Sequence, residues 1–370
     1  MYLELSNELI EEIISKKNEN TLNNFFNVLD SYAQGNHIVA LENRKYSTEL
    51  EDYFKSNASL ENIFYHVYQN HQDNITLRKS LQVYVRVGNS ESKFSQHIEK
   101  NCVKIFDVPI VYFDNQLLNT SLVTENTVDG YFYKGLVDRM MEENKFGLPQ
   151  NIVLNCSNDA GGGNQIGPFF HNKAQIEKRI TFSICDSDKK SISSKIGETA
   201  EVISSVNKRI NHNRICDLII LKVREKENLI PPSCYCQHSN YKNFEGLFLL
   251  ESIENHESLG AEIQYLKISA ETDDTTKFFK KQFSRSILAN KYNIGKSGVS
   301  TVSKEFIYTS KYLKSINQNF KKNSEGARHY QEQYNLFFEK ISPDLLKEYM
   351  RIAIQLISWT CSFPKLRLAN

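Results

Sequence analysis

One stretch of the chain decides the fold: SLVTE at residues 121–125, followed by NTVDG at residues 126–130. Its apolar, β-branched part stops on an acid, Glu125. That pattern is typical of a buried parallel strand that delivers a carboxylate to its C-terminal end. In open α/β sheets ligands bind at this end of the strands, so Glu125 is the first candidate for a functional site.

A second apolar run further along the chain stops on acids in the same way. Residues 180–185, ITFSIC, lead directly into Asp186 and Asp188, which are separated by one serine. Because parallel strands end at the same edge of a sheet, we expect Glu125, Asp186 and Asp188 to converge on one point. Three carboxylates in one place repel one another unless a hard cation neutralises them, so the pattern predicts a Mg²⁺ (or Mn²⁺) site.

A glycine-rich segment lies between the two acidic strand ends. The apolar run 152–154, a further expected strand, comes before Gly161, Gly162 and Gly163. We expect a turn there that needs positive φ. The same glycines would let the phosphate backbone of a nucleic acid approach exposed N–H groups, which makes them candidate nucleic-acid contacts. A fourth strand is expected at the apolar run 218–223.

The order of these elements resembles the TOPRIM fold of topoisomerases, primases and the overcoming-lysogenization-defect (OLD) type nucleases. The resemblance covers roughly residues 118–235. In that family the first strand ends in a pattern similar to V-E-G-x-x-D; this chain has VTENTVD at residues 123–129, with Asn126 where glycine is usual. DSD at residues 186–188 resembles the family's D-x-D. REKENL at residues 224–229 resembles the R-x-x-E-N-(Y/L) segment of OLD-like and defence-associated members.

The resemblance implies an α/β fold with a TOPRIM-like (Rossmann-like) parallel sheet and helical N- and C-terminal extensions. It also implies catalytic roles for Glu125, Asp186 and Asp188, with the glutamate shuttling a proton or binding metal. Asp129 and Glu227 join these three as implied metal ligands, since OLD-like enzymes use additional acids for a second ion.

The residues themselves leave plainer interpretations open. Asp186 and Asp188 also suit a turn or a helix cap, which aspartate often forms. Asp129 would be stabilised near the N-terminus of a helix that begins after Glu125. Glu227 would equally suit a surface loop.

The composition of the chain indicates what kind of protein carries this site. The 370 residues are 40% apolar with a formal net charge of +1, which favours a soluble protein of two or three domains. No apolar run approaches the length of a transmembrane helix, and no signal-peptide pattern opens the chain. Seven scattered cysteines, several within apolar runs, indicate reduced thiols and a cytoplasmic location.

We expect three regions along the chain. Residues 1–117 form a mixed helical and strand region, 118–235 the TOPRIM-like catalytic domain, and 236–370 a mainly helical C-terminal region. Within the first region the apolar spacing predicts one or two amphipathic helices over residues 1–33. The alternating run 81–87 predicts a half-exposed strand.

The C-terminal region has two notable segments. Residues 342–359 predict a helix with a proline at its start and an apolar stripe. The stretch 277–322 holds eleven Lys and Arg residues against one acid, interleaved with aromatic residues. That mixture suits contacts to a nucleic-acid backbone together with stacking on bases, and we assign Lys280, Lys281 and Arg285 to this role. The alternative is a helical region whose aromatic residues form a core and whose lysines are solvated.

The expected function is a Mg²⁺-dependent nuclease acting on DNA or RNA, as the effector of a prokaryotic anti-phage defence system. The chain has no G-x-x-x-x-G-K-[ST] motif, so an ATPase partner would be encoded separately. A homodimer is left open, and no membrane contact is expected. Two alternatives remain: another TOPRIM phosphoryl-transfer chemistry, or a non-catalytic TOPRIM-like partner or regulatory subunit of an ATPase complex.

The basic stretch yields a first prediction. Replacing Lys280, Lys281 and Arg285 together by alanine should flatten the dependence of log affinity on log salt by about two to three units, because each phosphate contact releases condensed counterions. The measurement is nucleic-acid binding over a series of salt concentrations. An unchanged slope would assign the stretch to a protein partner instead.

Overall fold

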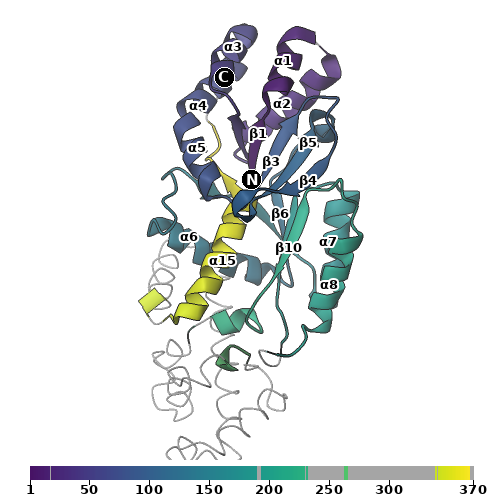
Figure 1. The fold of residues 1–370 in the computed structure, drawn as a ribbon, viewed down its shortest axis with the longest axis vertical. Helices are drawn as coiled ribbons and strands as arrows, with labels where there is room; N and C mark the ends of the chain where they lie inside the picture. Colours follow the sequence, from purple (N-terminus) through teal and green to yellow (C-terminus); the bar gives the residue numbers. More distant parts are fainter. Residues whose placement is uncertain are drawn as a thin grey trace, which may run out of the picture.

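The structure is a computed structural model that describes residues 1–16, 18–189, 193–229, 231, 262–265, 338–339 and 341–366. Two sheets built mainly of parallel strands follow one another along the long axis of the molecule (Figure 1). The prediction of an α/β fold with a parallel sheet is confirmed at this level. None of the helices in the described part of the chain has the length and apolar character needed to cross a membrane.

The first sheet belongs to the N-terminal region and has the order β2-β1-β3-β5-β4. All its strands are parallel except β4. The strands are β1 (Tyr2–Leu5), β2 (Ile38–Leu41), β3 (Val83–Gly88), β4 (Ser95–Ile98) and β5 (Lys104–Pro109). The helices of this region are α1 (Asn7–Lys16), α2 (Glu19–Ala33), α3 (Lys45–Phe54), α4 (Ala58–Gln69) and α5 (His71–Ser80). Residues 1–117 therefore form a sheet of their own.

Two expectations for this region need correction. The chain opens with a strand, β1, which pairs with β2 and β3, and the helices begin only after Ser6. A run of four buried residues, three of them apolar, is too short for periodicity to separate a strand from a helix. Ser6 does start α1, since its Oγ accepts from the Leu9 N–H at 3.3 Å. The strand near residue 83 is confirmed as β3, but it is largely buried, because β1 and β5 flank it and helices cover it.

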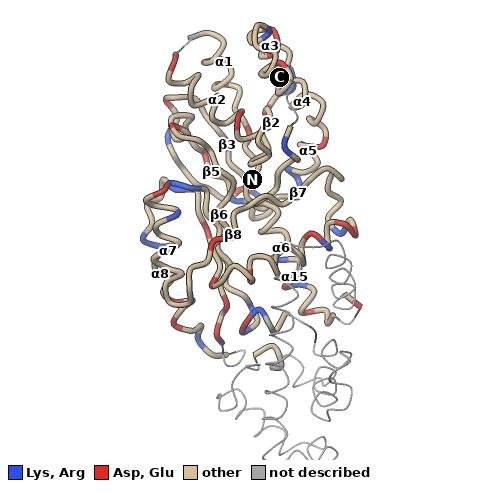
Figure 2. Tube along the Cα trace, turned by 180° about the vertical axis from the view of Figure 1, so that it is seen from behind, with Lys and Arg blue, Asp and Glu red and all other residues tan. Residues whose placement is uncertain are grey.

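The second sheet carries the acidic strand ends. It contains four parallel strands in the order β10-β9-β6-β8. The strands are β6 (Thr120–Thr124), β8 (Cys156–Ala160), β9 (Thr181–Cys185) and β10 (Cys216–Ile220). The connecting helices are α6 (Thr127–Glu142), α7 (Ile166–His171) and α8 (Glu198–Arg209). The helices α7 and α8 lie side by side on one face of this sheet (Figures 1 and 2). The strand side chains that point to this face, such as Val123 and Cys185, form a core beneath them.

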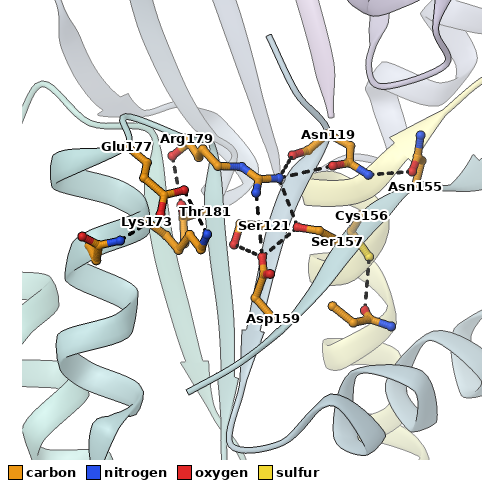
Figure 3. Close-up of polar contacts among 12 residues, drawn as sticks. Asn119, Ser121, Asn155, Cys156, Ser157, Asp159, Lys173, Glu177, Arg179 and Thr181 are labelled. Atoms are coloured by element: carbon orange, nitrogen blue, oxygen red, sulfur yellow. Dashed lines mark hydrogen bonds and ion pairs between the residues drawn. The ribbon is translucent and has the colours of Figure 1, made fainter. Parts of the chain in front are cut away.

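The second strand of this sheet is not the apolar run 152–154, as expected from the sequence. That run contains β7 (Val153–Leu154), which pairs antiparallel with β11 (Cys361–Ser362). The strand that pairs with β6 is β8, whose sequence CSNDA is polar. Its side chains are satisfied locally: Asp159 Oδ2 accepts from Ser121 Oγ at 2.6 Å and from Ser157 Oγ at 2.7 Å, and Arg179 lies beside them (Figure 3). An edge strand with its own polar partners needs no apolar pattern.

The C-terminal helix joins the two sheets. α15 (Pro343–Thr360) confirms the predicted helix, with Pro343 in its first turn and Ser342 Oγ accepting from the Leu345 N–H at 3.3 Å. Near its end, the fully buried Trp359 stacks on Phe182 of β9 with ring centroids 5.3 Å apart. The same indole meets the edge of Phe106 of β5 at 5.9 Å. One hydrophobic core therefore runs through both sheets.

Trp359→Ala should lower the free energy of unfolding by about 3–5 kcal/mol, because a large cavity would open between the sheets. The matched control is Leu346→Ala on the same helix, whose side chain is 38% exposed and whose loss should cost within about 0.5 kcal/mol. Urea denaturation followed by circular dichroism measures both. Equal effects from the two variants would contradict the role given to Trp359.

Candidate functional site

The two acidic strand ends lie at the point where the order of strands reverses. From β6 the chain passes through α6 to β8 on one side, then returns past β6 to β9 on the other side. Ligands of open α/β sheets bind at such a switch point, beyond the carboxyl ends of the strands. Glu125 directly follows β6, and Asp186 directly follows β9. The register pairs Val123 with Ser183, so both strands end at nearly the same level.

A buried cysteine lies beside one of the predicted carboxylates. Cys185 is fully buried, and its Sγ donates to Glu125 Oε1 at 3.9 Å. Burial raises the pKa of the Cys185 thiol, and the negative charges of Glu125, Asp186 and Asp188 raise that pKa further. The structure thus brings Glu125 against the thiol of Cys185, a residue that the sequence analysis did not single out as part of the site.

The segment after β10 holds the aspartates in place. The N–H groups of Ser187 and Asp188 donate to the Arg224 carbonyl at 3.0 and 2.9 Å, and the Lys226 N–H donates to Asp186 Oδ1 at 3.1 Å. Asp188 has a φ of 50°, in the left-handed region that aspartate tolerates better than most residues. It packs against Gly197, the residue that precedes α8, but no side chain caps the N-terminus of that helix with a hydrogen bond.

Asp129 has two protein partners. Its Oδ2 accepts from the Asn126 N–H at 3.1 Å at the start of α6, and its Oδ1 forms an ion pair with Lys226 Nζ. Asp129 is 6% exposed and Lys226 is 7% exposed. Asp129 therefore serves the N-terminus of α6, as the plainer interpretation expected, and a metal ion at Asp129 would have to compete with Lys226. Lys226 is a site residue that the sequence analysis missed, although it lies within the REKENL segment.

The glycine turn is built for close packing. The N–H groups of Gly161 and Gly162 donate to the carbonyls of Thr124 and Glu125 at 2.8 and 2.9 Å. A Cβ at Gly161 would lie 2.4 Å from the Cα of Ile166, and Gly162 has a φ of 71°. These two N–H groups are used within the protein to fix the backbone of Glu125, which favours the turn over a phosphate contact at these positions.

The remaining predicted site residues are not placed. The side chain of Glu227 lies outside the described part of the chain. Lys280, Lys281 and Arg285, with the whole stretch 277–322, also lie outside it and belong to the grey trace of Figure 2.

The acids at the switch point offer few ligands to a metal ion. Among the described residues, no group of three or more His, Cys, Asp and Glu side chains is arranged to hold one. Mg²⁺ keeps most of its water ligands and uses only one or two carboxylates together with phosphate oxygens. Glu125 and Asp186, delivered by neighbouring strands, fit that smaller requirement in number and chemistry.

Comparison of the chain with known protein families, with curated proteins and with solved structures finds no match. The fold and the site therefore define the class: a mixed α/β protein with two mainly parallel sheets, whose second sheet has acids at its switch point.

The buried pair of Lys226 and Asp129 is open to a double-mutant cycle. Lys226→Met should destabilise the protein by about 3–5 kcal/mol, because it leaves the Asp129 carboxylate buried without its cation. Adding Asp129→Asn should recover part of that loss, since the amide oxygen still accepts from the Asn126 N–H. Chemical denaturation of the four proteins gives the coupling energy. Additive losses would show that the two side chains do not depend on each other.

Proposed function

We propose that the chain is a divalent-metal-dependent phosphodiesterase, most specifically a Mg²⁺-dependent nuclease. The observation that carries the proposal is the delivery of Glu125 and Asp186 by adjacent parallel strands to one switch point. Asp188 is separated from Asp186 by one serine in the same segment after β9. The resemblance of residues 118–235 to TOPRIM proteins supports the same chemistry.

The protein's own groups have distinct tasks in this proposal. A bound Mg²⁺ would be held by Glu125 and Asp186 and would supply a polarised phosphodiester and an activated water. Lys226 orients Asp186 through its backbone N–H and balances the charge of Asp129 through its ammonium group.

Cys185 is unsuited to act as a nucleophile. A cysteine reacts as the thiolate, and thiolates form where nearby cations or helix N-termini lower the pKa. Burial and three neighbouring carboxylates raise the pKa of Cys185, so it remains a protonated thiol near neutral pH. This favours attack by water over a covalent cysteine intermediate.

A second candidate function is a non-catalytic module in a larger complex. Lys226 and backbone N–H groups already satisfy much of the acidic centre within the protein, which is the observation that favours it. In that case the acids would be structural, and the switch point would bind no catalytic ion.

The biological setting follows from the sequence resemblance. We propose nucleic acid as the substrate, a separately encoded ATPase as partner and anti-phage defence as the role. The basic stretch 277–322 is the proposed path of the nucleic acid toward the acids.

Asp186→Asn and Glu125→Gln should each lower Mg²⁺- or Mn²⁺-dependent cleavage of DNA or RNA by about 10²- to 10³-fold, since a catalytic metal contributes several kcal/mol to the transition state. Isothermal titration calorimetry should show weaker Mn²⁺ binding in both variants. Melting without metal should be little changed in Asp186→Asn, because the amide oxygen still accepts from the Lys226 N–H.

The matched control is Asp217→Asn. Asp217 lies in β10 and pairs with Lys104 at 2.8 Å, at the strand end opposite the acids. This variant should retain both metal binding and cleavage. If the unaltered protein binds no divalent cation, or if the site variants bind it as tightly, the acidic centre is structural and the second candidate function holds.

A further inference from the structure

The N-terminal sheet contains a cavity that the proposed nuclease activity does not use. Its volume is about 400 Å³, within the range of small-molecule sites, about 300–1,000 Å³. It lies between α5 and the face of the sheet that presents Tyr2, Glu4 and Tyr84. The acidic switch point belongs to the other sheet, so the two sites are separate.

The floor of this cavity holds a buried carboxylate. Glu4 lies on β1, between β2 and β3, and is only 3% exposed. Its Oε1 pairs with Arg78 Nε at 3.1 Å, and its Oε2 lies 3.6 Å from Arg86 Nε without a hydrogen bond. Inner strands of parallel sheets are usually apolar, and a buried acid is costly unless both of its oxygens are well paired. Oε2 of Glu4 is held only by the longer ion pair with Arg86, so it can still accept a hydrogen bond from a ligand.

Asn74 gives a second, independent observation. It lies on α5, lines the cavity and is 1% exposed. Neither its Nδ2 nor its Oδ1 has a hydrogen-bond partner, although nearly all buried polar groups in proteins have one. A donor and an acceptor side by side on one amide match the edge of a nucleobase, as asparagine does when it binds adenine bidentately.

The mouth of the cavity is cationic as well as acidic. Lys79 and Lys100 are exposed there, next to the partly exposed Arg78. Arg78 is held by Tyr84, whose hydroxyl accepts at 2.8 Å and whose ring lies under the guanidinium at 4.9 Å. These three cations can receive a phosphate group.

Both acids at the mouth already have partners in the protein. Glu42 Oε2 accepts from the Asn7 N–H at 3.0 Å, and Glu99 lies 3.7 Å from Arg86. The two lysines are therefore the charges best placed to meet an anion that enters the cavity.

We propose that this cavity binds a nucleoside monophosphate. The base edge is bonded by Asn74 on α5 and by Glu4 on the sheet, and the phosphate is bonded by Lys79 and Lys100 at the mouth. The inference does not depend on the nuclease proposal, because no residue of the acidic switch point takes part.

Isothermal titration calorimetry of the full chain with AMP, GMP, CMP and UMP, with their nucleosides and with inorganic phosphate tests the site. At least one nucleotide should bind, more tightly than its nucleoside and than phosphate. The double variant Lys79→Ala/Lys100→Ala should weaken that nucleotide at least tenfold and leave its nucleoside unchanged. The control Lys55→Ala/Lys208→Ala removes the same charge from exposed positions elsewhere and should change neither. Absence of nucleotide binding, or equal binding of phosphate alone, would overturn the proposal.

Asn74→Leu separates a binding role from a structural one. It should abolish binding of both nucleotide and nucleoside, and it should raise the melting temperature of the ligand-free protein, because an unpaired buried amide is replaced by an apolar side chain of similar size. Retained binding would overturn the assignment of the base edge. A lower melting temperature would show that Asn74 is a structural residue, and would overturn it as well.

Discussion

The pairing of β6 with strands on both of its sides is the constraint on which the candidate site depends. β6 binds β9 on one side and β8 on the other, all three parallel. Parallel pairing brings the ends of β6 and β9 to one edge, and the acids Glu125 and Asp186 follow there. In the glycine turn after β8, the N–H groups of Gly161 and Gly162 donate to the carbonyls of Thr124 and Glu125 and so fix the backbone at this strand end. A change of register by one residue would turn Glu125 away from Cys185.

The acids at this edge of the sheet differ in how their negative charges are offset. Asp129 and Lys226 neutralise each other in a buried pair, and Asp186 accepts from a backbone N–H. Glu125 instead lies against the Cys185 thiol, a weak donor, so little in that contact offsets its charge. Lys226 thus connects the segment after β10 to both α6 and the end of β9.

The helix α15 joins the two sheets by packing against both of them. It is separated from the second sheet by more than a hundred residues of sequence, yet Trp359 packs between Phe182 and Phe106. The segment that follows α15 lies beside Met1, because the N-terminal ammonium of Met1 donates to the Cys361 carbonyl at 2.6 Å. The two sheets share a core for this reason. The first sheet, which carries the cavity, and the second, which carries the acids, therefore pack on one hydrophobic core.

The sequence by itself determined the elements whose signals are local. The acid-ended runs became β6 and β9, the glycines became a turn, and Pro343 began the last helix. Each of these follows from side-chain alternation, from an apolar run that stops, or from residues with special backbone preferences. The convergence of Glu125 with Asp186 followed too, because parallel strands share an edge.

Tertiary structure alone decided the elements whose partners lie far away in sequence. β1 is a strand because β2 and β3 pair with it, and β8 is a strand because Ser121 and Arg179 satisfy its polar side chains. Lys226 belongs to the site because the segment after β10 lies against α6, where its ammonium pairs with Asp129. Glu4 and Asn74 face one cavity because α5 covers the first sheet. Burial and strand pairing depend on the three-dimensional neighbours of a residue. The pattern of residues next to it in the sequence does not specify those neighbours.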